Sequence, residues 1–240
     1  MAKLNEIIQW CDHTLKSHEF KDYAPNGLQI EGDAEVNKIL CAVTASQDAI
    51  EAAIEQGANL LLVHHGYFWK GEPYPITGMR GKRIKRLIQH DISLLAYHLP
   101  LDSHPTLGNN ASIADLLELE NIEALDPSER HPIGNIGYLK QPMSATDFKH
   151  YVSTRLKFDV THLAAEKASI QKIGYCTGGA QDFIVKAAEQ NCDAYISGEV
   201  SERTFYEAKE LNVHYYACGH HATERFWVQR LGKALSDQFH

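Results

Sequence analysis

Two pairs of adjacent histidines are the residues of this sequence whose types and spacing best suit chemistry. His64 and His65 directly follow the apolar run 61–63, and His220 and His221 follow a second apolar segment far downstream. Imidazole and carboxylate groups placed at strand ends are how α/β proteins build sites for divalent metal ions. The sequence therefore indicates metal chemistry before it indicates any substrate.

Carboxylates accompany the histidines at a regular spacing. His220 and Glu224 are four residues apart just before a helical pattern, so on a helix they share one face. His98 and Asp102 have the same spacing after another predicted strand, where Pro100 restricts the backbone. A shared metal ion is one interpretation. The alternatives are that Glu224 only complements a helix dipole and that residues 98–102 form a surface turn.

The adjacency of His64 and His65 leaves two arrangements open. Neighbouring residues of a strand point to opposite faces. Both imidazoles can serve one site if the strand has already broken at Gly66, and otherwise they would serve two metal ions.

Other chemistries receive less support. The sequence has no nucleophile elbow, no His-Glu-x-x-His zinc motif and no P-loop. The five cysteines are scattered and odd in number, which favours reduced core residues over disulfides, and the apolar context of Cys218 favours a core thiol over a nucleophile. The turn Thr177-Gly178-Gly179 either cradles an anion or is a plain turn.

The charge distribution limits which classes of binding partner we expect. A net charge of −8 argues against sequence-independent nucleic-acid binding by the whole surface. One basic cluster lies within residues 80–86, and it is either a solvated helix face or a phosphate-attracting rim beside the site. The start of the chain lacks a secretory signal, and no run approaches the roughly 20 apolar residues that span a bilayer. We therefore expect a cytoplasmic protein without a membrane partner.

Apolar periodicity predicts an opening helix followed by alternating strands and helices. Residues 4–15 form an amphipathic helix in this interpretation, because their apolar side chains recur at helical spacing. The elements that follow are a strand at 39–43, a helix at 46–56 stopped by Gly57, a strand at 60–63, a helix at 82–89 and a strand at 93–97.

The same order recurs 134 residues later without a gap. Gln47-Asp48 matches Gln181-Asp182, Ile50 matches Ile184, and Glu55-Gln56 matches Glu189-Gln190. This alignment places His65 opposite Glu199. It predicts strands at 173–176, 194–196 and 213–217 with helices at about 181–190 and 202–211. Chance similarity between two amphipathic helices is the alternative.

Alternating strands and helices predict an α/β fold made of two related halves, with mostly parallel sheets covered by helices. His64, His98, Glu199 and His220 all follow predicted strands, where loops carry function in such folds. The polar segment 126–132 is predicted to be a linker.

Five motifs, in this order, closely resemble the NIF-three-like family, whose bacterial members are labelled GTP cyclohydrolase I type 2 homologues. The resemblance covers nearly the whole chain and is to the short form of the family. The motifs are Asn26-Gly27-Leu28-Gln29, His64-His65-Gly66, His98-x-Pro-x-Asp102, Gly108-Asn109-Asn110 and Gly219-His220-His221-Ala222-Thr223-Glu224.

The resemblance implies a dinuclear metal centre in which Glu224 bridges the two ions. The implied ligands are His64, His65, Asp102, His220 and Glu224. It also implies two interlinked α/β domains and a ring-shaped hexamer with the sites facing an internal cavity. We expect the first domain to span residues 1–125 plus 213–240 and to carry most of the ligands, and the second to span 126–212.

Two positions depart from the family pattern. Many members have Tyr where this chain has His221, so the resemblance does not assign His221 to the site. Members commonly continue into a further strand, whereas this chain stops at residues 239–240.

The leading functional hypothesis is a metal-dependent hydrolase acting on a nucleotide or related phosphorylated heterocycle. Two divalent ions, of Zn, Fe, Mn or Ni, would generate a hydroxide nucleophile. Glu224 would fix their separation, and His98 would shuttle a proton or orient ligands, so these are the expected catalytic residues. Arg80, Lys82 and Arg83 would hold the phosphate. The alternative is a ring-shaped scaffold whose metals are structural and whose partner is DNA or a protein.

Overall fold

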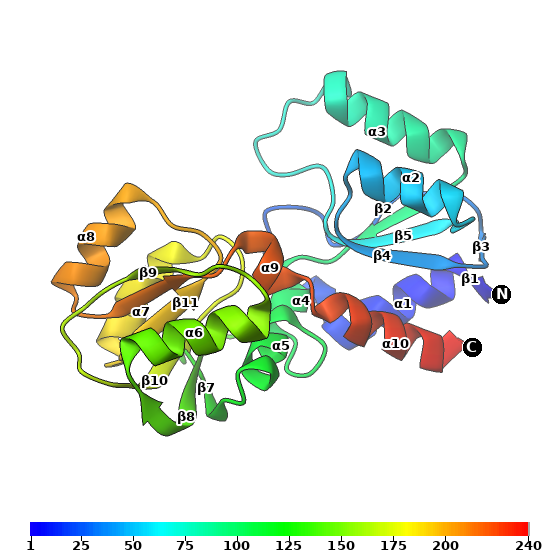
Figure 1. Ribbon diagram of the computed structural model, residues 1–240. Helices are drawn as coiled ribbons and strands as arrows, with labels where there is room; N and C mark the ends of the chain where they lie inside the picture. The colour runs from blue at the N-terminus through cyan, green and yellow to red at the C-terminus, as the bar shows by residue number, and fades with distance from the viewer. Residues whose placement is uncertain (240) are drawn as a thin grey trace. The chain divides into compact units, whose positions relative to one another are not determined.

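The computed structural model describes residues 1–239, and residue 240 lies outside the described part. The chain forms two compact units, and it passes from one to the other twice (Figure 1). The first unit contains Met1–Leu101 and the C-terminal segment from Trp227, and the second contains Asp102–Phe226. The boundaries expected from the sequence lie near residues 125 and 213.

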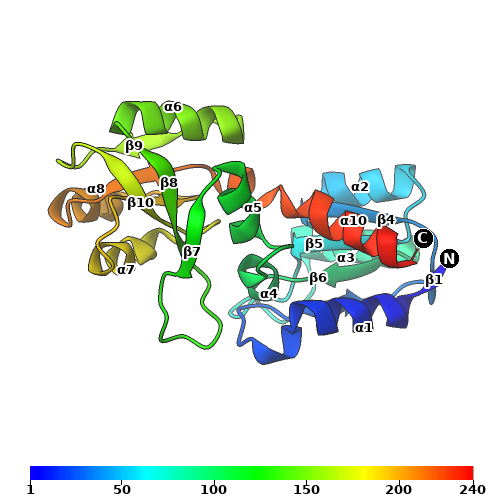
Figure 2. The ribbon, with the colours of Figure 1, turned by 90° about the horizontal axis from the view of Figure 1, so that it is seen from below.

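The first unit is a mixed sheet with helices on both faces. Its strand order is β2-β6-β5-β4, with β2 Gly27–Ile30, β4 Ile39–Thr44, β5 Leu60–His65 and β6 Ser93–Ala96. Strands β4, β5 and β6 are parallel, and β2 is antiparallel to β6. Helices α2 Gln47–Glu55 and α3 Gly78–Gln89 cover one face, and α1 Leu4–Leu15 and α10 Trp227–Phe239 cover the other (Figure 2). The remaining elements are β1 Ala2–Lys3, η1 Ser17–Glu19 and β3 Glu35–Val36.

Local sequence explains where helix α2 begins and ends. The hydroxyl of Ser46 accepts a hydrogen bond from the backbone N–H of Ala49 at 3.1 Å, which caps the first turn. Gly57 follows the helix with φ +66, a conformation that glycine adopts without the strain other residues incur. These are the start and the stop that the sequence predicts.

The second unit is built around a larger mixed sheet. Its strand order is β7-β8-β10-β11-β12-β9, in which β10, β11 and β12 are parallel and the other pairings are antiparallel. The strands are β7 Glu120–Ala124, β8 Asn135–Met143, β9 Thr161–Leu163, β10 Ile170–Tyr175, β11 Ala194–Ser197 and β12 His214–Ala217. The helices are α4 Leu99–Ser103, α5 Asn109–Leu116, α6 Ala145–Leu156, η2 Gln181–Phe183, α7 Ile184–Glu189, α8 Glu202–Glu210 and α9 His220–Glu224, of which α4 continues from the first unit.

Two hydrophobic clusters hold the helices of the second unit against its sheet. Phe148 of α6 and Ile113 of α5 pack with Ile173 of β10 in one cluster. Ile184 of α7 and Ala208 of α8 belong to the other. The sheet is therefore covered on both faces, as expected for an α/β unit.

The internal repeat is confirmed at the level of strand register. Ile39 of β4 pairs with Leu60 of β5, and the residues 134 positions later, Ile173 of β10 and Ala194 of β11, pair in the same parallel manner. The predicted α/β class is confirmed. Both sheets are nevertheless mixed: β2 adds an antiparallel pairing at one edge of the first sheet, and in the second sheet β7 and β8 lie on one side of the parallel centre and β9 on the other, all in antiparallel pairings.

Two further expectations can be compared with the described residues. No helix there is long and apolar enough to cross a membrane. The cysteines are all free thiols, and Cys218 is fully buried. Burial raises the pKa of the Cys218 thiol, so it stays protonated and is a poor nucleophile.

Candidate metal centre

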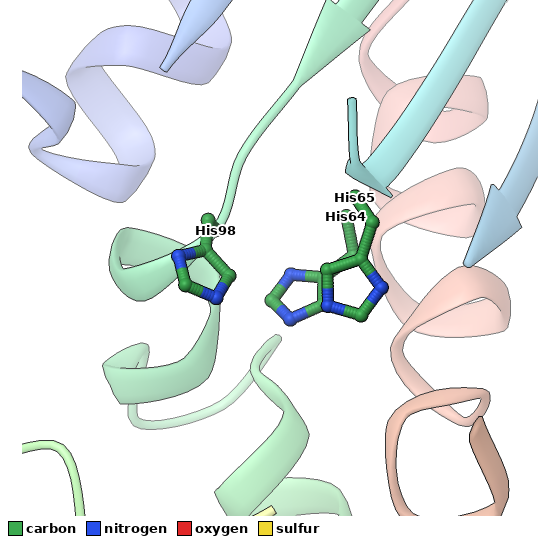
Figure 3. A group of neighbouring side chains, drawn as sticks. All are labelled: His64, His65 and His98. Atoms are coloured by element: carbon green, nitrogen blue, oxygen red, sulfur yellow. The ribbon is translucent and has the colours of Figure 1, made fainter. Parts of the chain in front are cut away.

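Three imidazoles of the first unit meet at the carboxyl ends of two parallel strands (Figure 3). His64 and His65 end β5, and His98 directly follows the segment that leaves β6. Potential ligand atoms of the three residues all lie within 4.8 Å of one another. This cluster could hold a metal ion.

The two adjacent histidines gather without a break in the strand. Strand β5 includes both His64 and His65, yet their ring centroids are 4.5 Å apart, and that of His64 is 5.0 Å from His98. The strand end therefore accommodates both imidazoles in one cluster. The break at Gly66 that the sequence argument required is not needed.

A backbone carbonyl sets the tautomer of His64. Its Nδ1 lies 2.8 Å from the carbonyl oxygen of Tyr97, and because that oxygen can only accept, Nδ1 must carry the proton. The lone pair then lies on Nε2, the arrangement typical of a metal-binding histidine. Nδ1 of His65 lies 3.2 Å from the hydroxyl of Thr44 on the neighbouring strand.

The carboxylate of Asp22 positions His98. Its Oδ1 lies 2.7 Å from Nδ1 of His98, and its Oδ2 accepts the backbone N–H of Leu99 at 2.9 Å. Asn26 joins the two, since its side chain donates to Asp22 at 2.9 Å and accepts the backbone N–H of His98 at 2.8 Å. Burial is the largest single effect and raises the pKa of Asp22, but the hydrogen bonds from His98, Asn26 and Leu99, together with the charge of His98, outweigh it and lower the pKa of this carboxyl.

Sequence reasoning did not single out Asp22. The available signal was its position four residues before Asn26, a residue of the first family motif. On its own, that spacing does not reveal which histidine the carboxylate contacts.

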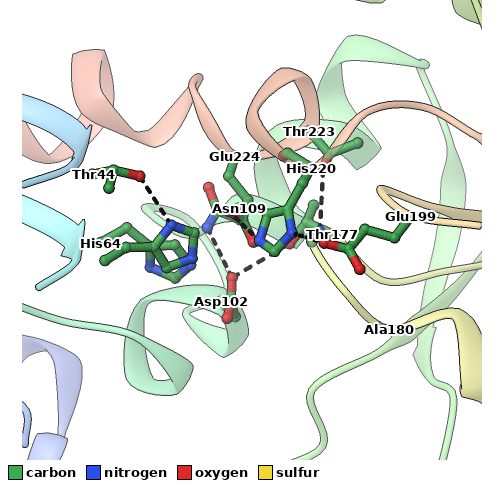
Figure 4. A network of polar contacts seen from close by, with 12 residues as sticks. Thr44, His64, Asp102, Asn109, Thr177, Ala180, Glu199, His220, Thr223 and Glu224 are labelled. Carbon is green, nitrogen blue, oxygen red and sulfur yellow. Dashed lines mark hydrogen bonds and ion pairs between the residues drawn. The ribbon is translucent and has the colours of Figure 1, made fainter. Parts of the chain in front are cut away.

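In the second unit, Asp102 and Glu224 present their carboxylates to each other. Potential ligand oxygens of the two residues lie within 4.8 Å of one another. Oδ1 of Asp102 accepts a hydrogen bond from the Asn109 side chain at 2.8 Å and one from the hydroxyl of Thr177 at 3.3 Å (Figure 4). These donors hold one carboxylate oxygen and fix the orientation of the group.

The glycine turn after β10 makes room for Glu224. A Cβ atom at Gly178 would lie 2.1 Å from Oε1 of Glu224, and Gly178 has φ +68. Its backbone N–H donates to the hydroxyl of Thr223 at 3.1 Å. We call this turn a cradle in the sense that it leaves room for the carboxylate of Glu224. Because the N–H of Gly178 donates to Thr223, anion binding by the turn stays a prediction.

His220 lies between two carboxylates. Its Nε2 is 3.2 Å from Oε2 of Glu224, and its Nδ1 is 2.7 Å from Oε1 of Glu199 (Figure 4). The hydrogen bond with Glu224, aided by the one with Glu199, raises the pKa of His220 to about 9. The helical i,i+4 relationship between His220 and Glu224 is confirmed, because both belong to α9.

Comparison with known proteins settles the family. The family described as Duf34/NIF3 (NGG1p interacting factor 3) matches residues 2–240. The chain belongs to the DUF34/NIF3 family. A relative from Vibrio cholerae serotype O1, named GTP cyclohydrolase 1 type 2 homolog, is 49% identical over 94% of this chain and 90% of its own length. A relative of the same name from Haemophilus influenzae is 48% identical over 98% of this chain and 93% of its own.

Solved structures give the same result for the fold. The solved structure of protein ybgI, described as of unknown function, is 42% identical to this chain and superposes with a TM-score of 0.93. The alignment covers 98% of this chain and 94% of the ybgI chain. TTHA1606 from Thermus thermophilus has a TM-score of 0.89 at 28% identity over 99% and 95% of the two chains. The resemblance inferred from the five motifs is thereby confirmed.

In this DUF34/NIF3 protein the basic residues predicted to contact phosphate, and His221, differ in their surroundings. Arg80 forms an ion pair with Glu72 at 2.7 Å and donates to the carbonyl oxygens of Pro73 and Pro75, so it braces the loop before α3. Lys82 is exposed on α3, and Arg83 is partly exposed. Among the described residues, His221 is exposed and belongs to none of the clusters of potential ligands.

The donor set of each unit fits a divalent cation. The first unit offers imidazole nitrogens, and the second offers two carboxylates with one imidazole. Mixed nitrogen and oxygen donors suit first-row transition ions such as Zn, Fe, Mn or Ni. This DUF34/NIF3 protein therefore has His, Asp and Glu clusters that could bind metal.

Proposed function

We propose that this protein holds two divalent metal ions and hydrolyses a nucleotide or a related phosphorylated heterocycle. The proposed ligands are His64, His65, Asp102, His220 and Glu224. One observation carries the proposal: His64, Asp102 and His220 are each already oriented by a second residue, as ligands in metal sites are. The name of the relatives, GTP cyclohydrolase 1 type 2 homolog, supports the substrate class.

Chain connectivity supports one shared centre. The chain leaves the first unit after Leu101 and returns at Trp227, so both crossings lie next to a proposed ligand, Asp102 or Glu224. Because each residue spans at most about 3.6 Å, the four-residue step from His98 to Asp102 limits how far apart their backbones can lie. A shared centre with ligands from both units is part of this proposal, and the diffraction experiment described in the Discussion tests it.

The metal ions would supply Lewis acidity, which lowers the pKa of water and stabilises developing negative charge. Glu224 would hold the ions through its carboxylate and keep them in position. His64 and His220 would keep their orientation through Tyr97 and Glu199. In this proposal the protein's main contribution is to hold the donors in position before the substrate arrives.

His98 is proposed to move the proton. Its Nδ1 is engaged by Asp22, so its Nε2 is the atom that would accept a proton from water and return it to the leaving group. Asp22 thereby acts as a positioning residue. Lys82, Arg80 and Arg83 remain the proposed phosphate contacts, and Lys82 is the most exposed of the three. The ring-shaped hexamer and the cytoplasmic location remain predictions.

The test is turnover by protein loaded with one metal at a time. Nucleotides and related phosphorylated heterocycles are incubated with the protein and the products are separated by chromatography. We expect turnover that falls by about 100-fold or more in His64→Ala and in Glu224→Gln, with cooperative unfolding retained. His221→Ala is the matched control, because His221 is exposed and outside the ligand clusters, and it should keep wild-type turnover.

A different set of results would favour the scaffold hypothesis. If no substrate turns over with any metal, and DNA binds in a salt-dependent manner that Arg80→Ala and Lys82→Ala abolish, then the scaffold hypothesis replaces the hydrolase.

A further inference from the structure

The second unit contains a cavity of about 450 Å³ whose walls include none of the five proposed metal ligands. Its polar wall comes from the segments around β7, α5 and β10. The polar residues that matter here are His104, Asn110, Asp115, Arg130, His131 and Tyr175. A volume of this size is within the range of small-molecule sites.

Tyr175 supplies the first sign that the cavity is built for a ligand. The side chain is 1% exposed, it lines the cavity, and among the described residues its hydroxyl has no hydrogen-bond partner. Buried hydroxyl groups are normally paired, so a buried phenol without a partner needs a reason. Burial raises the pKa of Tyr175, and its hydroxyl is therefore a neutral donor.

The charges around the cavity indicate the chemistry of that ligand. Arg130 and His131 come from the loop between β7 and β8, and His104 comes from the segment after α4. The planar guanidinium of arginine matches the geometry of a carboxylate or a phosphate. Asp115 and Glu123 also line the cavity, and they would accept hydrogen bonds from hydroxyl or amino groups.

We propose that this cavity is a binding site for a small polyhydroxylated or amino-bearing organic oxyanion, a phosphate or a carboxylate. Arg130 pairs with the oxyanion, the hydroxyl of Tyr175 donates to it, and Asp115 accepts from the polar body of the ligand. The apolar side of the wall, which includes Pro105 and Ile122, contacts the carbon skeleton.

One side chain connects the cavity to Asp102. The Nδ2 of Asn110 donates to the backbone carbonyl of Asp102 at 3.2 Å and to that of Ile133, at the end of the loop that carries Arg130. Its Oδ1 accepts the backbone N–H of Thr177 at 3.0 Å. A ligand that orders the loop therefore also restrains the backbone of Asp102. If Asp102 is a metal ligand, as the proposed function has it, the bound ligand would change the affinity for metal. Binding of the ligand to the cavity does not depend on the proposed function.

The experiment is calorimetric titration of the full-length, metal-loaded protein with ribose 5-phosphate, with gluconate and with uncharged ribose. We expect one of the two oxyanions to bind at one site per chain, and ribose to bind much more weakly. Arg130→Gln and Tyr175→Phe should each weaken that binding by about tenfold or more, because each removes a donor to the oxyanion. Arg203→Gln and Tyr206→Phe, exposed residues outside the cavity, are the matched controls and should bind as the wild type does.

Three outcomes would overturn the proposal. They are no binding of either oxyanion, equal binding of ribose, and binding that neither cavity variant weakens. Glu199→Gln, titrated at a metal concentration that saturates the variant, separates this site from the metal centre: Glu199 does not line the cavity, so oxyanion binding should stay intact. Thermal unfolding of each variant checks its fold. If Tyr175→Phe does not fold, the effect of Arg130→Gln, which lies on an exposed loop, tests the site by itself. If the oxyanion binds as expected but turnover of nucleotides is never found, the proposed function fails and this site stands.

Discussion

Oδ1 of Asp22 lies 2.7 Å from Nδ1 of His98, and Oδ2 of the same carboxylate accepts a hydrogen bond from the backbone N–H of Leu99 at 2.9 Å. The same carboxylate therefore fixes both the ring and the backbone that carries it.

We expect Asp22→Asn to lower kcat by about 10- to 100-fold while metal content stays near the wild-type value, because the proton carrier is misoriented and the ligands are not. Steady-state kinetics and elemental analysis of the same preparation measure both. Asp237→Asn, at an exposed position of α10, is the control, and a loss of metal equal to the loss of turnover would refute this role for Asp22.

Glu199 should act on metal affinity through His220. Its Oε1 lies 2.7 Å from Nδ1 of His220, so it orients the ring and raises its basicity. Glu199→Gln is expected to weaken metal binding by about 10- to 100-fold, measured by competition with a chromophoric chelator. Glu210→Gln, at an exposed position of α8, should leave the affinity unchanged. Equal affinities for the Glu199 variant and the wild type would show that this contact does not serve the metal.

Two neighbouring glycines provide a matched pair for the cradle around Glu224. A Cβ at Gly178 would lie 2.1 Å from Oε1 of Glu224 with φ +68, whereas the nearest atom to a Cβ at Gly179 is 3.5 Å away. Gly178→Ala should therefore displace Glu224, lower metal content and reduce the unfolding temperature. Gly179→Ala should change neither by much. Elemental analysis and thermal unfolding distinguish them, and similar behaviour of the two variants would contradict the cradle.

Much of the fold could be predicted from the sequence because its pattern is local. Helix α1 spans the predicted residues Leu4–Leu15, and the repeat between β4-α2-β5 and β10-α7-β11 keeps even its strand register. Strands β7, β8 and β9 were not predicted. Their burial patterns lack clear alternation: β7 and β9 are edge strands with mostly exposed or half-buried residues, and β8, which lies between β7 and β10, is exposed over residues 140–142.

The candidate site could be predicted only in part. Histidines and carboxylates at strand ends stand out by residue type, and the alignment of the repeat also drew attention to Glu199. The contact from Asp22 to His98 joins positions 76 residues apart, and that from Thr177 to Asp102 joins positions 75 apart. Such contacts depend on how the strands assemble, which no local pattern encodes.

A histidine pair in the second unit should make stability depend on pH. Nε2 of His162 lies 3.1 Å from Nδ1 of His214, and the ring stacks on Tyr216 at a centroid distance of 4.5 Å. Burial, with the nearby His214, lowers the pKa of His162 to about 4. An unfolded histidine has a pKa of about 6.5, so between these values the unfolded state binds more protons than the native state.

The free energy of unfolding should therefore fall as the pH drops from about 6.5 to about 4 and level off below that, once other groups are allowed for. The contribution is below the limit of about 1.4 kcal/mol per pH unit for one proton, because solvent reaches part of the ring. Urea unfolding across this pH range measures it. His162→Gln should flatten the dependence, and His150→Gln, at an exposed position of α6, should not. An unchanged slope in His162→Gln would assign the dependence to other groups.

The most direct test of the dinuclear centre is anomalous diffraction from crystals of the metal-loaded protein, collected on either side of the absorption edge of the metal. The account predicts two peaks about 3.5 to 4 Å apart, contacted by His64 and His65 from one unit and by Asp102, His220 and Glu224 from the other, with Glu224 touching both. No peak at these residues, or peaks whose ligands come from one unit alone, would contradict it.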